Sequence, residues 1–72
     1  MKTAYIVEGT RIERKRDGAI ATVVNRTREQ VRPYGVFRTL LTIRLDDDEL
    51  RAQVGGDQTG ELSWLVSNFR VI

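Results

Sequence analysis

A glycine between two short segments of alternating apolar and polar residues constrains the fold of this chain more than any other feature. Residues 10–15 alternate Ile12 with charged neighbours, which predicts a half-exposed β-strand because successive side chains of a strand point to opposite faces. Residues 16–18 end in Gly18 and predict a tight turn, since glycine tolerates the positive φ of hairpin turns. Residues 19–26 are apolar on both faces and predict a second, well-covered strand. We therefore expect a β-hairpin here.

Short alternating segments continue to the end of the chain, and none shows the apolar spacing of an amphipathic helix. Further strands are predicted over residues 36–45, 50–54, 62–66 and 70–72, with an edge strand at 5–7. Between them we predict a polar loop over 27–35 with a type I turn at 33–35, a charged turn at 46–49, a loop at 55–60 and a single helical turn at 67–69. Five or six short strands predict an all-β, antiparallel small barrel, because closure removes exposed strand edges.

Alternation also predicts which side chains form the core. One face of the strand over 36–45 carries Phe37, Leu41, Ile43 and Leu45. In the strand over 62–66, Leu62, Trp64 and Val66 point to the core and Leu65 lies on the opposite face. Leu40 likewise lies on the face of the strand over 36–45 that is opposite the core.

The length of 72 residues predicts one domain, residues 1–72, with a small core for which self-association into a homo-oligomer would add burial. The absence of cysteine excludes disulfides and thiolate chemistry and suits a reducing cytoplasm. No segment resembles a signal peptide or reaches the ~20 apolar residues of a membrane helix, so we expect a cytoplasmic protein without a membrane partner.

The formal net charge of +2 hides a strong asymmetry along the chain. Residues 1–44 hold ten basic and four acidic residues, a net charge of +6, whereas residues 45–72 hold two basic and six acidic residues, a net charge of −4. A basic half can bind a polyanion, support head-to-tail association or only add solubility, and charges on adjacent strands can neutralise each other after folding.

The spacing of Gly9, Ile12, Gly18, Ala21 and Val23 resembles the KOW motif and, more widely, the Src homology 3-like barrels. A short bend before the last strand is also typical of such barrels. The resemblance implies a contact with nucleic acid or RNA polymerase, as in ribosomal and transcription relatives.

Residues 9–15 are also similar to the opening of the plasmid-borne type II dihydrofolate reductases, which are tetrameric barrels. Residues 61–66 lack the glutamine of their pore segment, so this likeness implies self-association rather than reductase activity.

Enzymatic activity is not expected from this composition. The chain has no histidine and no cysteine, which removes the usual general base near neutral pH, thiol nucleophiles and nearly all zinc sites. No phosphate-binding glycine loop is present, and we predict no cofactor. The acidic run at residues 46–49 is either a site for a hard cation or a solvated turn; we predict the turn and no metal.

Two binding functions remain. The first is a contact with RNA or DNA, in which arginines bind phosphates and Tyr34 stacks on a base; the candidate residues are Arg14, Lys15, Arg16, Arg26, Arg28, Arg32, Tyr34 and Arg38. The alternative is a protein-interaction or self-associating adaptor module that uses Leu40, Trp64 and Leu65. The small size suits an accessory gene of a phage, plasmid or gene cassette.

Overall fold

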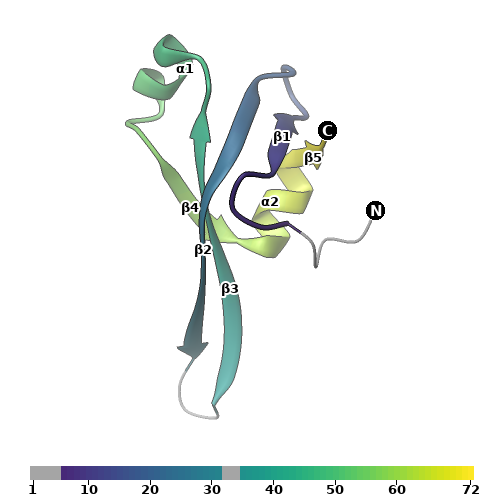
Figure 1. The fold of residues 1–72 in the computed structure, drawn as a ribbon, viewed down its shortest axis with the longest axis vertical. Helices are drawn as coiled ribbons and strands as arrows, with labels where there is room; N and C mark the ends of the chain where they lie inside the picture. Colours follow the sequence, from purple (N-terminus) through teal and green to yellow (C-terminus); the bar gives the residue numbers. More distant parts are fainter. Residues whose placement is uncertain (1–5, 32–34) are drawn as a thin grey trace.

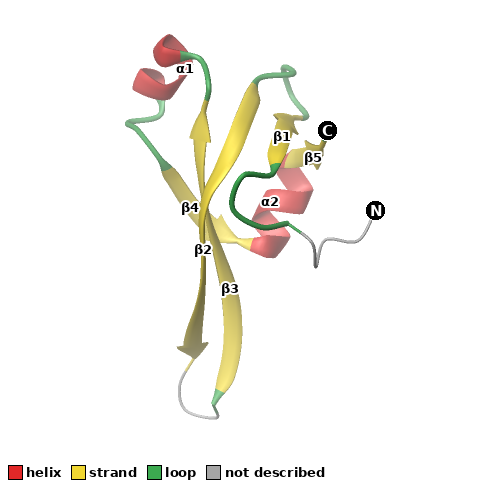
Figure 2. Cartoon of the chain, in the orientation of Figure 1, coloured by secondary structure: helices red, strands yellow, loops and turns green. Residues whose placement is uncertain are grey.

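One antiparallel sheet and two short helices make up the fold (Figures 1 and 2). The structure is a computed structural model and describes residues 6–31 and 35–72. Its elements are, in chain order, β1 (Arg11–Arg14), β2 (Ile20–Val31), β3 (Val36–Leu45), α1 (Asp48–Gln53), β4 (Gln58–Glu61), α2 (Leu62–Asn68) and β5 (Phe69–Val71). The strand order is β4-β3-β2-β1-β5. The predicted antiparallel β-fold is thus confirmed. Within the described residues the sheet is open, with β4 and β5 at its edges, so closure into a barrel remains a prediction.

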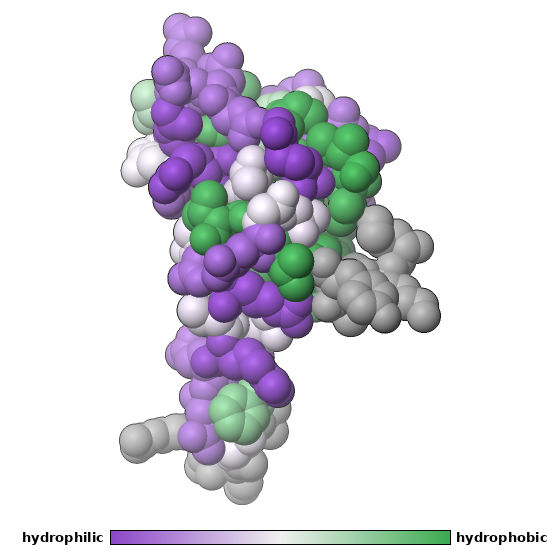
Figure 3. Space-filling model, viewed as in Figure 1, coloured by the Kyte–Doolittle hydropathy of each residue, from purple (hydrophilic) through white to green (hydrophobic). Residues whose placement is uncertain are grey.

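The predicted loop over residues 27–35 is largely strand. β2 continues to Val31 and pairs with β3 as far as Val31 opposite Val36. This part of the ribbon lies beyond the core, and its surface is mainly hydrophilic (Figure 3). Because no apolar face marks it in the sequence, its polar composition predicts a loop where the structure has a strand. The predicted type I turn at 33–35 falls mainly on residues outside the described ones. Residues 28–31 of β2 and 36–39 of β3 pair only with each other, and we call this projecting ribbon the arm (Figure 1).

Two of the predicted strands are helices. Residues 48–53 form α1, because the Asp47 carboxylate caps its first turn by accepting hydrogen bonds from the backbone N–H groups of Glu49 and Leu50. Acidic residues in the first turn and Arg51 in the last also suit the helix dipole. The prediction of a charged turn and a strand over 50–54 was therefore wrong.

The strand predicted over residues 62–66 is α2. Leu62, Leu65 and Phe69 follow a helical spacing, and Leu65 and Phe69 are buried. The single helical turn expected before the last strand is thus a helix of two turns. β4 occupies part of the predicted loop at 55–60, and Ile6 and Val7, described from the predicted edge strand at 5–7, belong to no strand.

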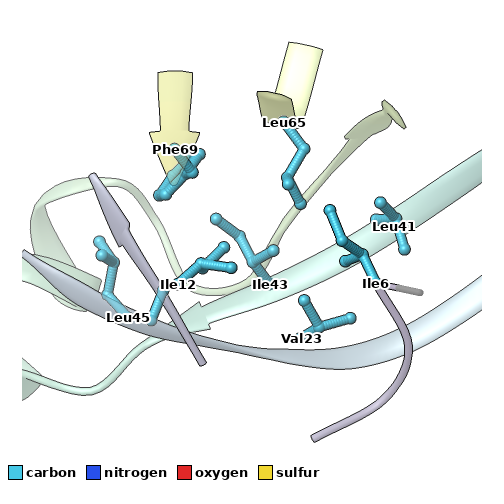
Figure 4. Packing of buried hydrophobic residues seen from close by; sticks show 9 residues of the cluster. Ile6, Ile12, Val23, Leu41, Ile43, Leu45, Leu65 and Phe69 are labelled. Carbon is cyan, nitrogen blue, oxygen red and sulfur yellow. The ribbon is translucent and has the colours of Figure 1, made fainter. Parts of the chain in front are cut away.

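The core lies between one face of the sheet and α2 (Figure 4). Its buried side chains are Ile6, Ile12, Ala21, Val23, Leu41, Ile43, Leu45, Leu65 and Phe69. Three of the four residues predicted for the core face of β3 are among them. The fourth, Phe37, has the same orientation but is 55% exposed, because it lies on the arm beyond α2. The sheet thus has a covered body and an uncovered arm.

Candidate nucleic-acid interface

Ion pairs neutralise most of the sheet face opposite the core. Basic residues of the first half of the chain meet acidic residues on neighbouring strands and connections: Arg11 with Asp46, Arg38 with Glu29 and Glu61, Arg44 with Asp57, and Arg70 with Glu13. The bond from Arg44 holds the pKa of Asp57 below its usual value. The charge asymmetry of the sequence therefore largely cancels on this face, which offers no uniform basic surface to a phosphate backbone.

Three basic residues at the end of β1 and in the turn to β2 lie in different surroundings. Arg14 points to the core side and is only 8% exposed, and its guanidinium donates two hydrogen bonds to Asp17, at 3.0 and 2.7 Å. Lys15 Nζ donates to the carbonyl of Val66 at 2.9 Å. The Arg16 side chain is 74% exposed, with Nε 4.0 Å from Asp17. The prediction that Arg14 contacts phosphates from an exposed hairpin does not fit this geometry, because Asp17 occupies its guanidinium.

We expect Asp17 to titrate far below an ordinary carboxyl group. The hydrogen bonds from Arg14 and the Ala19 backbone lower the pKa of Asp17 from 3.8 to about 2. Because the folded value is depressed, the stabilising contribution is complete above pH 3.8 and is lost as the pH falls through about 2. NMR titration of the carboxyl carbon should give that value, and Asp17→Asn should flatten the loss of stability between these pH values. A wild-type pKa near 3.8 would contradict the observed bonding.

An open groove of about 470 Å³ lies beside the same turn. We call it the turn groove, and its polar and aromatic lining includes Lys15, Arg16, Gln58, Trp64, Ser67 and Asn68. The half-buried Trp64 ring meets Phe69 edge-on, with ring centroids 5.7 Å apart. The groove thus brings three of the predicted phosphate contacts, Arg14, Lys15 and Arg16, beside Trp64, which the sequence assigned to a protein interface.

The arm carries the other basic residues. The Arg28 guanidinium lies 5.2 Å from the centroid of the exposed Phe37 ring, a cation–π arrangement. Arg26, at the base of the arm, donates to the carbonyl of Ile6 at 2.7 Å. Arg38 bonds Glu29 and Glu61 and is therefore neutralised. The remaining predicted contacts, Arg32 and Tyr34, fall outside the described residues. The sequence does not predict Phe37 as an exposed aromatic residue, because its position in the alternation matches the core face of β3.

The two basic segments lie at opposite ends of the molecule (Figure 1). β2 begins near the turn and runs twelve residues to the end of the arm, a length of about 36 Å over eleven steps of ~3.3 Å. The longest dimension of the chain is 40 Å. The predicted basic residues therefore divide between two separate sites rather than forming one patch.

The residues predicted for a protein interface do not lie on one common surface. Leu40 is half-buried on the sheet face opposite the core. Leu65 is 1% exposed and points into the core, so its assignment to an exposed face was wrong. The helical period of α2 turns Leu65 inward, whereas the period of a strand would have turned it outward.

The acidic run at residues 46–49 has structural partners. Asp46 accepts hydrogen bonds from Arg11 and Thr22, Asp47 caps α1, and Asp48 bonds Arg51. Among residues 6–31 and 35–72, no three potential ligands gather into a metal-binding cluster.

Comparison of the chain with protein-family models, curated proteins and solved structures gave no match. In the part of the chain that the structure describes, no helix has the length and apolar character needed to cross a membrane.

Proposed function

We propose that the protein is a non-enzymatic nucleic-acid-binding module whose contact is the arm. The observation that carries this proposal is the projection of a two-stranded ribbon with Arg28 and Phe37 exposed side by side, next to a body whose cations are largely paired. A ribbon of two strands has the dimensions that the major groove of DNA admits. An exposed aromatic ring beside an arginine also suits stacking on bases in a single strand.

The sequence of the arm supports the same proposal. Residues 28–39, the arm and its connection, hold three arginines and one glutamate, a net charge of +2, although Arg38 is paired with Glu29 and Glu61. Residues 32–35 connect the two strands in the sequence, and among them Arg32 and Tyr34 add a cation and an aromatic ring to this segment. Cations that neutralise phosphates supply most of the affinity of such contacts.

We further propose that the body is a Src homology 3-like barrel domain of the KOW type. Gly9 and Gly18, the glycines of the motif, have φ values of +89° and +76°, where other residues are strained. A helix before the last strand and pairing of β1 with β5 also support this assignment.

The test is fluorescence anisotropy with labelled single- and double-stranded oligonucleotides at several salt concentrations. We expect binding that weakens steeply with salt, because phosphate contacts release counterions. Arg28→Ala should weaken binding to all sequences and reduce the slope of log K against log salt by about 1. Phe37→Ala should cost about 1–3 kcal/mol where a base stacks on the ring.

The matched control is Arg44→Ala, which removes the same charge from the ion-paired body. Binding that is absent at low salt, or that Arg28→Ala and Arg44→Ala reduce equally, would overturn the proposal. Thermal melts of each variant separate lost binding from lost folding.

The exposed Phe37 and the arm favour one alternative, a protein-interaction or self-associating module. Both long edges of the arm are unpaired within the described residues, and such edges pair readily with another strand. Contacts of this kind depend little on salt. Sedimentation of the purified protein as a monomer at all concentrations would exclude self-association.

A further inference from the structure

The turn groove is a second candidate binding site, separate from the arm. Its walls come from the end of β1 and the turn that follows, from Val54 and the start of β4, and from α2 and the first residue of β5. The volume of about 470 Å³ falls within the range of ~300–1,000 Å³ that small-molecule sites occupy. The groove is therefore large enough to hold a ligand the size of a nucleotide.

The positive charge of the turn groove favours a negatively charged ligand. Among the described residues that line it, none is acidic, and the nearby Asp17 accepts two hydrogen bonds from Arg14. The Lys15 ammonium group has three N–H donors and uses one on the carbonyl of Val66, so two are available to a ligand. Arg16 adds an exposed guanidinium, which binds phosphate oxygens in pairs.

The other side of the groove suits a flat heterocycle. The half-buried Trp64 supplies aromatic surface and packs against the buried Phe69 ring, and it is the only tryptophan of the chain. Asn68 donates its amide N–H to the carbonyl of Trp64, which leaves its side-chain oxygen as an acceptor, and Gln58 adds a second amide. These groups are of the kind that recognise the edge of a base.

We propose that the turn groove binds a nucleoside 5′-monophosphate, with the phosphate on Lys15 and Arg16 and the base against Trp64. The ligand is either a free nucleotide or the 5′-terminal nucleotide of a strand, which present the same chemistry. The site is independent of the arm, because the length of β2 separates them.

Trp64 allows a direct test by intrinsic fluorescence, with isothermal titration calorimetry as a second readout. Uridine 5′-monophosphate should quench the Trp64 emission saturably. Uridine and inorganic phosphate should each have a Kd at least about tenfold higher. The double variant Lys15→Ala, Arg16→Ala should raise the Kd for the nucleotide at least about tenfold, because two charge-assisted hydrogen bonds are lost.

The matched control is Arg11→Ala, which removes an arginine that pairs with Asp46 and does not line the groove, and it should leave nucleotide affinity unchanged. Arg28→Ala should also leave it unchanged, which separates this site from the arm. A 5′-phosphorylated dinucleotide that binds more tightly than the mononucleotide would assign the groove to the end of a strand, and equal affinity would assign it to the free nucleotide.

Three results would overturn the proposal. They are the absence of saturable quenching and of heat at low salt, an unchanged affinity in the double variant, and binding of inorganic phosphate as tight as that of the nucleotide. The last result would leave an anion site without a contribution from the base. None of these outcomes depends on whether the arm binds an oligonucleotide.

Discussion

Leu65→Ala should lower the free energy of unfolding by about 2–5 kcal/mol, the range for removing a buried leucine side chain from a core. The Leu65 side chain is 1% exposed and points from α2 into the cluster that Ile12, Ile43 and Phe69 also form (Figure 4). A domain of this size has only ~3–5 kcal/mol of net stability, so the variant should be largely unfolded at 37 °C. Chemical denaturation followed by circular dichroism measures the change.

Leu40→Ala is the matched control, because it removes the same atoms from a half-buried position on the other face of the sheet. Its effect should be clearly smaller than that of Leu65→Ala. Equal losses, or a larger loss for Leu40→Ala, would mean that residues 62–66 do not form the observed helix.

Gly60→Ala should destabilise the protein by about 1–3 kcal/mol, the usual effect of overpacking. A Cβ at this position would overlap Trp64 Cε3 and lie 2.7 Å from Cδ2. Both are atoms inside the indole ring, so the whole side chain has to move, and with it a wall of the turn groove. Denaturation gives the loss of stability, and a shift of the Trp64 emission to longer wavelength reports displacement of the ring toward water.

A double-mutant cycle separates this clash from an intrinsic effect of alanine in β4. Trp64→Leu opens space above Gly60, so Gly60→Ala should cost much less in that background. Additive effects of the two substitutions would refute the predicted contact. Backbone strain does not enter, because Gly60 is not among the glycines with positive φ.

The first hairpin and the central strand were predictable because local rules decide them. Gly18 has a positive φ, and β3 has the predicted bounds and buries Leu41, Ile43 and Leu45 as alternation requires. Both helices escaped prediction because each is short. Over residues 62–66, the alternation of Leu62, Trp64 and Val66 fits a strand, while the spacing of Leu62, Leu65 and Val66 fits a helix equally well. Only packing against the sheet selects the helical period that buries Leu65.

The sequence predicts which residue types form the candidate sites, but it does not predict which of these residues lie together in the structure. Lys15, Arg16 and Arg28 were identified from composition, yet nothing local indicates that Arg14 is held by Asp17 or that Arg38 is neutralised by two glutamates. Trp64 joins the basic turn only because β5 pairs with β1 and brings α2 beside it.

The amino-acid sequence by itself determined the antiparallel β-class, the hairpin turn and the absence of histidine and cysteine chemistry, because these depend on neighbouring residues or on composition alone. Only the tertiary structure decided which charges cancel, which segments are helices and that the basic residues divide between an arm and a groove. These properties depend on contacts between residues far apart in the chain, and the long β2–β3 ribbon sets the distance between the two sites.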